Sequence, residues 1–308
     1  MELGKLHQAF CEINPERLNY LGNVNATAVE KLRRGNSLLG LDVDGVLLKG
    51  ESGPDEFTIP NLAKIIPHLD RNLQLRLVTA RSKDVLQILR TLSAYPLELL
   101  GPHIIEEGHA WLYDNSVHPI VPEDYIQFYK SLHTDLNNGG LCASWEEVQR
   151  KPNSYCWGDP RWQGLYSGSL WFRNQDRVVM QDKLSNMVSQ LSAQSSVPVD
   201  YRFNSQPDSD LAWMRIGSKD IHKAHRLQTL GLPDVYICDG PNDRRVFQTM
   251  KPDILLPYMR NLGGLTIVVK GSPDQETDDM KWVYKNADVT LNNYGELGYL
   301  LSLMVSSI

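Results

Sequence analysis

An apolar run that ends in two closely spaced carboxylates constrains the fold of this 308-residue chain more than any other feature. The run at 37–41 is followed by Asp42 and Asp44, and then by Gly45. A continuous apolar run of this kind predicts a buried strand of a parallel sheet. Two carboxylates at one strand end repel each other unless a cation or a proton lies between them. Ligands bind at the carboxyl ends of strands in open α/β sheets, so this position predicts a metal site with a chemical role.

Two other interpretations of the same residues have to be weighed. Asp-x-Asp-Gly is common in turns, because Asp caps turns and Gly adopts positive φ. It also resembles the start of a calcium-binding loop, which needs a Glu at its twelfth position. Counted from Asp42, the twelfth residue is Gly53, which excludes the calcium loop. A turn and a functional site remain equally compatible with these residues taken alone.

The composition narrows the classes of partner. Hydrophobic residues make up 42% of the chain and charged residues 22%, and the net charge is −6 at pH 7. An acidic chain lacks the basic face that nucleic acid requires, so we expect a small-molecule partner and no nucleic acid. The sequence shows neither a secretory signal nor an apolar stretch of about 18 residues, so we expect a cytoplasmic protein with no membrane partner.

The cysteines indicate a reducing environment. Their spacing matches no zinc site and no CxxC pair, so we expect structural thiols. The four cysteines are Cys11, Cys142, Cys156 and Cys238.

The order of predicted strands and helices divides the chain into three parts. Residues 37–117 and 217–308 alternate between strand and helix patterns, which predicts an α/β core with a doubly wound, Rossmann-like parallel sheet. Residues 118–216 have a different character, with strands joined by hairpin-like or helical links, and predict an inserted α+β domain. Residues 1–36 form an N-terminal extension with a short helix near 26–34.

The expected elements follow from apolar periodicity and from capping residues. In the core, strands are expected at 73–78, 103–105, 235–238, 265–269 and 287–291, and helices at 60–70, from Ser82 to about 92, and from 219 to 230. In the insert, strands are expected at 164–173, 197–203 and 211–216, and a helix at 179–193.

Three of these strands end in polar residues suited to phosphoryl transfer. Asp42 and Asp44 end the first, Thr79 the second and Asp239 the third, and a lysine lies near the start of a helix. In a parallel sheet these groups gather at one edge. One carboxylate can attack phosphorus and a second can transfer protons. Mg²⁺ accepts carboxylate and phosphate oxygens, while a hydroxyl and an ammonium group neutralise the phosphoryl oxygens.

The four segments together resemble the motifs of the haloacid dehalogenase superfamily of phosphatases, over about 42–300. They are 42–46, 79–81, a helix-start lysine and 239–243. The insert resembles the large cap of the Cof-type, sucrose-phosphatase, trehalose-phosphatase and phosphomannomutase branch. Segment 106–110 stands where that branch has an Asn-Gly-Ala turn, and 166–173 resembles its cap strand that ends in an Arg. Glu107, His109 and Cys238 depart from the branch pattern, which leaves the subfamily open.

The resemblance implies a role for each matching residue. Asp42 would be the nucleophile and Asp44 the general acid/base, while Thr79 would bind the transferring phosphoryl group. The Mg²⁺ ligands would be Asp42, Asp44 through its backbone carbonyl, Asp239 and Asp243. Arg81, Arg173 and Asn242 are expected to contact substrate, and Arg202 and Trp213 are further candidates for specificity in the cap.

The lysine has two candidates. Ser218-Lys219 follows the strand predicted at 211–216 and leaves a helix of usual length before Gly231, so we favour Lys219 as the fourth catalytic residue. Lys223 lies one helical turn further on, on the same face, and is the alternative.

Three functions are compatible with this set. The favoured one is a Mg²⁺-dependent phosphomonoesterase that hydrolyses a sugar phosphate or phosphorylated glycoside through an aspartyl-phosphate. A phosphotransferase, such as a sugar phosphomutase, would use the same intermediate. A non-catalytic binding module would require the loss of a motif residue, and none is lost.

Overall fold

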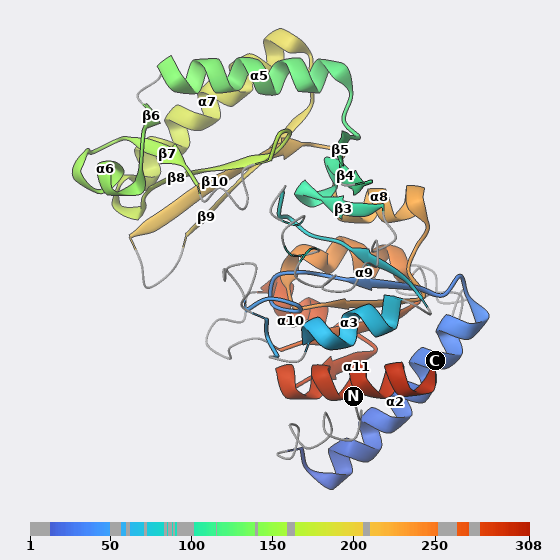
Figure 1. Ribbon diagram of the computed structural model, residues 1–308. Helices are drawn as coiled ribbons and strands as arrows, with labels where there is room; N and C mark the ends of the chain where they lie inside the picture. The colour runs from blue at the N-terminus through green and yellow to red at the C-terminus, as the bar shows by residue number, and fades with distance from the viewer. Residues whose placement is uncertain are drawn as a thin grey trace.

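The computed structural model describes residues 13–49, 57–59, 62–70, 73–82, 85, 88, 90, 102–114, 116–138, 141–158, 164–205, 210–251, 264–270 and 278–308. These residues form two lobes, each built on a five-stranded sheet. Figure 1 shows the smaller lobe, with α5 (Glu123–Asn138) and α7 (Arg177–Ser195), standing above the larger one. We call the larger lobe the core and the smaller one the cap.

The core sheet is parallel throughout, as the sequence predicts. Its strand order is β13-β12-β11-β1-β2. The last residue of β1, Leu41, lies opposite Leu77 of β2 and Ile237 of β11, so these three strands end at one edge of the sheet. The strands are β1 (Leu38–Leu41), β2 (Gln74–Leu77), β11 (Val235–Cys238), β12 (Leu265–Val269) and β13 (Val289–Leu291).

Helices cover both faces of this sheet because alternate strand residues point to opposite sides. Ile237 packs into the cluster that contains α3 and α11, whereas Tyr236 packs into the cluster that contains α8 and α9. The result is a three-layer arrangement that buries every residue of β1 and β11. The helices are α2 (Pro15–Arg34), α3 (Leu62–Asp70), α8 (Lys223–Leu230), α9 (Arg244–Met250), α10 (Asp278–Asn286) and α11 (Tyr294–Ser307).

The N-terminal extension differs from its prediction. The short helix expected near 26–34 is part of α2, which begins at Pro15. Asn14 caps it by accepting a hydrogen bond from the Glu16 backbone N–H, at 2.8 Å. Figure 1 shows α2 lying against α11 at the far end of the core from the cap. The two helices form part of one apolar cluster, which is why this segment is ordered as an element of the core.

The cap sheet has one face covered by α5 and α7 and a second, mostly open face, which α6 covers beside Trp171. Its strand order is β6-β7-β8-β10-β9, and α5 and α7 pack on residues of one face, such as Phe172 and Met214. The strand β10 ends at Ser218, two residues beyond its predicted end at Ile216. The elements are β6 (Leu141–Cys142), α6 (Trp145–Arg150), β7 (Tyr155–Trp157), β8 (Gly168–Arg173), β9 (Val199–Ser205) and β10 (Leu211–Ser218).

A small antiparallel sheet connects the two lobes. It consists of β3 (His103–Ile105), β4 (Ala110–Tyr113) and β5 (Ser116–Pro119), of which only β3 was predicted. Ile104 forms a parallel bridge with Val78, just beyond β2, so the sheet continues the edge of the core. The chain therefore enters the cap close to the carboxyl ends of the core strands.

Other sequence predictions have mixed outcomes. Within the predicted helix after Ser82, only residues 82, 85, 88 and 90 are described, and the rest lies outside the described residues. Cys142, Cys156 and Cys238 are buried free thiols, while Cys11 lies outside the described residues.

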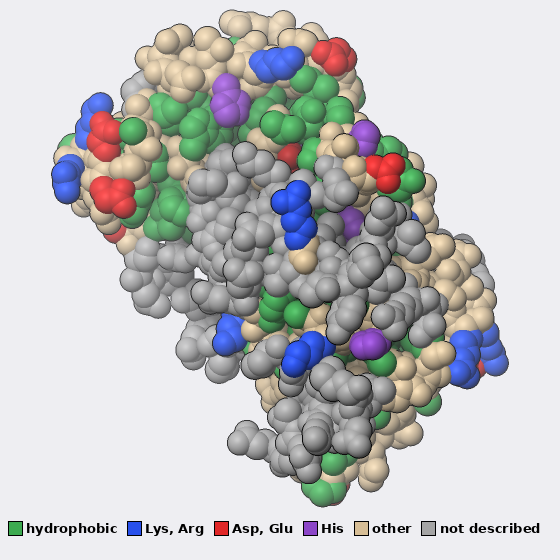
Figure 2. Space-filling model, viewed as in Figure 1, with side chains coloured by type: hydrophobic (Ala, Val, Ile, Leu, Met, Phe, Trp, Pro, Cys, Tyr) green, Lys and Arg blue, Asp and Glu red, His purple; other side chains and the backbone are tan. Residues whose placement is uncertain are grey.

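No described helix has the length and apolar character needed to cross a membrane. Figure 2 shows the described Lys and Arg side chains of one face scattered over both lobes.

Candidate active site

Asp42 lies directly after β1, at the edge where three core strands end. Its backbone N–H donates to the Ile237 carbonyl at 2.9 Å, which continues the sheet pairing to this residue. Its carboxylate accepts hydrogen bonds from the Val43 backbone N–H at 2.7 Å and from Lys223 Nζ at 2.7 Å. The side chain is buried, yet it contributes to the wall of a cavity between core and cap. The strand end thus presents one oriented carboxylate to an enclosed space.

Lys223, and not Lys219, is the lysine beside Asp42, which corrects the sequence prediction. Lys223 Nζ donates to Asp42 and, at 3.1 Å, to Asp243 Oδ1, whereas Lys219 is exposed. The reason is the strand end, because β10 runs on to Ser218 and the helix begins only at Lys223. The His222 side chain caps this helix by accepting from the His225 backbone N–H. The ammonium group therefore projects from the first residue of α8.

Three carboxylates meet at this strand edge and fit a bound metal ion. Ligand atoms of Asp42, Asp239 and Asp243 all lie within 4.8 Å of one another. Asp243 Oδ1 accepts from Lys223 and from the Tyr236 hydroxyl at 2.8 Å, but its Oδ2 is buried without a hydrogen-bond partner among the described residues. A buried carboxylate oxygen without a partner is costly unless a cation or water occupies the adjacent space. Hard oxygen donors of this kind suit Mg²⁺.

The electrostatics of the cluster also favour a cation. Three carboxylates face the single ammonium group of Lys223, so negative charge is in excess. Burial, with Asp243 adding to it, raises the pKa of Asp239 to about 7. Burial also raises the pKa of Asp42 well above its usual range, although Lys223 acts against this. Burial alone would lower the pKa of Lys223, but Asp243 and Asp42 outweigh it and raise that pKa.

Gly45 lets the loop after β1 approach Asp239. Its φ of +68° lies in the left-handed region, and a Cβ at this position would come within 1.7 Å of Asp239 Oδ2. No other residue fits here without moving Asp239. The glycine of the Asp-x-Asp-Gly segment therefore allows the close approach of two strand ends that the carboxylate cluster requires.

Asp44 is held by Arg81. The Arg81 Nε lies 2.9 Å from Asp44 Oδ1 and 3.1 Å from Oδ2, and Nη2 lies 2.6 Å from Oδ1. Arg81 is fully buried, whereas the Asp44 side chain is 26% exposed and lines the cavity. Arg81 thus holds the Asp44 carboxylate in place, and its predicted contact with substrate stays a prediction. A planar guanidinium suits this because its donors fit both carboxylate oxygens.

Structural comparison finds proteins with a similar fold, whereas sequence comparison finds no match. No family model matches the sequence, and no curated protein matches it. A crystal structure of a trehalose-6-phosphate phosphatase related protein aligns with TM-score 0.54 and 15% identity, over 88% of this chain and 97% of that one. Trehalose-6-phosphate phosphatase of Aspergillus fumigatus aligns with TM-score 0.51 and 11% identity, over 92% and 97%. The C-terminal domain of the Candida albicans trehalose synthase regulatory protein gives 0.50 and 10%, over 87% and 94%.

These alignments cover 88% and 92% of the chain, so they include both lobes. The chain has the haloacid dehalogenase fold. At 15% identity or less the likeness establishes the fold, so the resemblance read from the motifs is confirmed at that level.

The haloacid dehalogenase fold does not bring every predicted residue to the cavity. Of the residues predicted to contact substrate, Asn242 is exposed and does line the cavity. Arg173, the last residue of β8, forms an ion pair with Asp176 at 2.8 Å, and its contact with substrate stays a prediction. Thr79 is fully buried, and its hydroxyl accepts from the Arg81 backbone N–H at 3.1 Å. Its role in binding a phosphoryl group therefore stays a prediction.

The turn after β3 has a strained backbone. Glu106, Glu107 and Gly108 all have positive φ, at 52°, 56° and 101°. A Cβ at Gly108 would lie 2.7 Å from the His222 backbone, so this glycine permits close packing of the turn on the start of α8. Two consecutive non-glycine residues in this region are costly and occur mostly where function requires them. The turn directs Glu107 into the cavity.

The cavity lies between the two lobes and has a volume of about 470 Å³. Sequence reasoning missed several of its residues, including Glu107, Trp171, Arg215, His222 and Arg245. It also missed Tyr236, whose hydroxyl donates a hydrogen bond to Asp243 Oδ1 at 2.8 Å. The alternation along β8 and β10 is the signal that could have found Trp171 and Arg215, once the open face of the cap sheet was known.

Proposed function

We propose that this protein is a Mg²⁺-dependent phosphomonoesterase that hydrolyses a sugar phosphate or a phosphorylated glycoside. The observation that supports this most is the contact of Lys223 with Asp42 inside the cluster formed with Asp239 and Asp243, at the floor of the cavity. The fold shared with a trehalose-6-phosphate phosphatase of known structure supports the same class of substrate. The cavity, at about 470 Å³, has room for a sugar ring that carries one phosphate.

Each residue of the site has a role in this reaction. The Asp42 carboxylate attacks phosphorus and forms an aspartyl-phosphate while the bond to the leaving oxygen breaks. Asp44, oriented by Arg81, gives a proton to that oxygen and then takes one from the attacking water. Lys223 stabilises the negative charge of the phosphoryl oxygens. A Mg²⁺ ion held by Asp42, Asp239 and Asp243 supplies further charge neutralisation when it is bound.

The proposal is tested by removing the nucleophile. We expect wild-type protein with Mg²⁺ to release phosphate from members of a sugar phosphate panel, and Asp42→Asn to lower kcat by about 10³-fold or more. Asp182→Asn, on the exposed side of α7, is the matched control and should keep full activity. Turnover by Asp42→Asn at the wild-type rate would refute the mechanism. Appearance of the phosphate on a second sugar, rather than in water, would favour the phosphotransferase.

The metal site is tested through its linkage to stability. A ligand that binds only the folded state at 100 times its Kd adds about 2.7 kcal/mol to the free energy of unfolding. We therefore expect Mg²⁺ to raise the Tm of wild-type protein and of Asp182→Asn, and EDTA to reverse the change. Asp239→Asn should lose most of this shift in differential scanning fluorimetry. An equal Mg²⁺ shift in Asp239→Asn would place the metal elsewhere.

A further inference from the structure

The open face of the cap sheet presents aromatic and basic side chains to the cavity. Strand alternation sends Phe172 and Met214 toward α5 and α7, and it sends Trp171, Trp213 and Arg215 to the other side. Trp213 lies directly opposite Trp171 on the neighbouring strand. The cavity thus has catalytic carboxylates on its core side and an aromatic and basic surface on its cap side.

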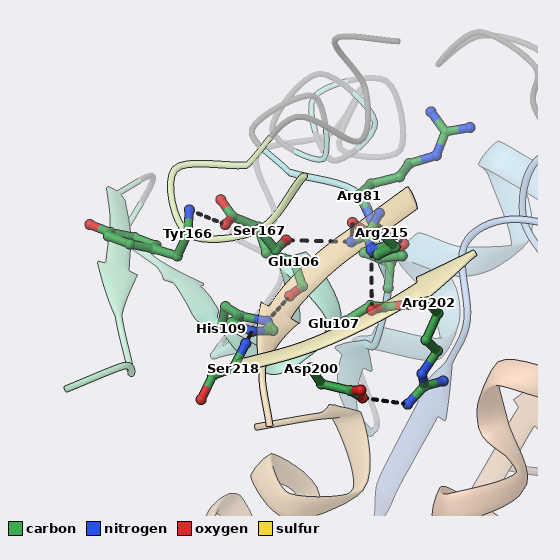
Figure 3. Close-up of polar contacts among 12 residues, drawn as sticks. Arg81, Glu106, Glu107, His109, Tyr166, Ser167, Asp200, Arg202, Arg215 and Ser218 are labelled. Atoms are coloured by element: carbon green, nitrogen blue, oxygen red, sulfur yellow. Dashed lines mark hydrogen bonds and ion pairs between the residues drawn. The ribbon is translucent and has the colours of Figure 1, made fainter. Parts of the chain in front are cut away.

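Two arginines of this face lie directly opposite each other. Arg215 of β10 is in register with Arg202 of β9, and like charges in such a cross-strand pair are destabilising. Figure 3 shows how carboxylates offset them, with Glu107 3.2 Å from Arg215 and Asp200 3.2 Å from Arg202. The two pairs are unequal, because the Arg215 side chain is 16% exposed and that of Arg202 is 57% exposed. An exposed pair is weak, so Arg202 is available to a ligand.

A third arginine reaches the same place from the core. Arg245, in α9, is exposed and lines the cavity together with Arg202, and both also line an adjoining polar cavity of about 720 Å³. Within the described part of the chain, Arg245 makes no hydrogen bond or ion pair. Burial, and then the charges of Arg245 and Arg202 among others, lower the pKa of His222 to about 4, so two cations from different lobes act on one imidazole.

This part of the cavity therefore has an excess of positive charge. Glu107 and Asp200 offset two of the three arginines, and Arg245 remains without a carboxylate partner among the described residues. The carboxylate cluster lines the same cavity but has its own cation, Lys223, which is paired with Asp42 and Asp243. Arginine at such a position favours planar oxyanions, because its forked donors bind a carboxylate or phosphate through two hydrogen bonds.

We propose that Arg202 and Arg245 bind a second anionic oxyacid group on the substrate, a carboxylate or a second phosphate, while the transferring phosphate lies at Asp42. The inference rests on the proposed phosphatase activity and narrows its substrate class to sugar phosphates that carry two anionic groups. Trp213 provides an apolar surface for the ring that joins these groups. Arg202 and Arg245 determine specificity and are not catalytic residues.

Matched substrates test the proposal. Glucose 1-phosphate, glucuronic acid 1-phosphate and glucose 1,6-bisphosphate share one ring and differ at C6, where they carry a hydroxyl, a carboxylate and a phosphate. Glycerol 3-phosphate and 3-phosphoglycerate form a shorter pair. We expect the wild-type kcat/KM for at least one dianionic member to exceed that of its neutral counterpart by about tenfold or more. Comparing the substrate with a C6 carboxylate and the substrate with a C6 phosphate shows which of the two anionic groups the arginines prefer.

Variants connect this preference to the two arginines. Arg202→Ala and Arg245→Ala should each lower the ratio of kcat/KM between dianionic and neutral substrates by about tenfold, and Arg202→Lys should restore part of it. Arg150→Ala, an exposed position of the same cap in α6, is the control and should leave the ratio unchanged. Raising the salt concentration should also weaken the preference.

Two results would overturn the proposal. One is a wild-type ratio within about twofold for every pair, and the other is an equal loss for all substrates in both arginine variants. Failure of the phosphatase proposal is distinguishable, because the wild type would then hydrolyse none of these esters. Calorimetry on Asp42→Asn would still report the site, through tighter binding of glucose 1,6-bisphosphate than of glucose 1-phosphate. Equal binding of the two would refute the second anion site.

Discussion

Lys223 is a buried cation whose two carboxylate partners come from different strand ends. Its Nζ contacts Asp42 after β1 and Asp243 after β11, and all three side chains are at most 7% exposed. Breaking a buried ion pair from one side leaves uncompensated charge, which costs more than the loss of an exposed pair. At the scale of single residues, Lys223 therefore contributes to stability as well as to the proposed chemistry.

Replacing this lysine separates the two candidates of the sequence. In EDTA we expect Lys223→Ala to lower the free energy of unfolding by about 3 kcal/mol, because Asp42 and Asp243 lose their counter-charge. Mg²⁺ should restore part of this loss, and kcat should fall by about 10²-fold. Lys219→Ala, at an exposed position, should leave both quantities unchanged. Urea unfolding and phosphate release measure them, and equal effects of the two substitutions would contradict the assignment.

At the scale of elements, α2 is fixed to the core by a buried carboxylate. Glu296 of α11 is 4% exposed in its side chain, and its oxygens accept from Arg17 Nε and Nη2, both at 2.8 Å. Arg17 Nη2 also donates to the Thr290 carbonyl in β13 (Val289–Leu291). One arginine thus joins α2 to a helix and a strand that lie more than 270 residues away along the chain, at separations of 279 and 273.

A pair of substitutions in α2 tests this attachment. Arg17→Ala leaves Glu296 with fewer donors in a buried position, so we expect the free energy of unfolding to fall by about 2 kcal/mol. Arg34→Ala removes an ion pair with Glu30 that is exposed on both sides, and we expect little change. Chemical denaturation of both variants measures the free energy of unfolding. A decrease in Arg34→Ala as large as in Arg17→Ala would argue against the attachment of α2 through Arg17.

At the scale of the whole molecule, His109 joins the two connections between core and cap. Its Nε2 accepts from the Ser218 backbone N–H at 2.8 Å, where the chain leaves the cap. Its Nδ1 therefore carries the proton and donates to the Glu106 carbonyl at 2.7 Å, where the chain approaches the cap. Burial lowers the pKa of His109 to about 4. The contact requires the neutral imidazole.

The pH dependence of stability follows from this pKa. The folded value of about 4 lies below the unfolded value of 6.5, so the unfolded state binds the proton more readily. The contribution of His109 is complete above pH 6.5 and is lost as the pH falls toward 4. Between pH 7 and pH 5 we expect wild type to lose about 2 kcal/mol more than His109→Gln. Urea unfolding at both pH values measures this, and parallel losses would contradict it.

Local patterns in the sequence determined the architecture of the core and its acidic residues. The strands Val235–Cys238 and Leu265–Val269 have the predicted bounds, because short, mostly apolar runs between polar ends favour buried strands. Asp42 and Asp239 follow such runs directly, and Asp243 comes four residues after Asp239. Their convergence then follows from the parallel sheet, in which strands end at one edge.

Only the tertiary structure decided which long side chains reach the site. Lysine and arginine extend over several bonds, so their place depends on where a helix begins and on which carboxylates lie nearby, and not on local pattern. Lys223 reaches Asp42 because β10 continues to Ser218 and delays the start of α8. Arg81 is paired with Asp44, and Arg245 of the core and Arg202 of the cap line one cavity because the two lobes lie against each other. The sequence determined the carboxylates, and long-range packing determined the cations that surround them.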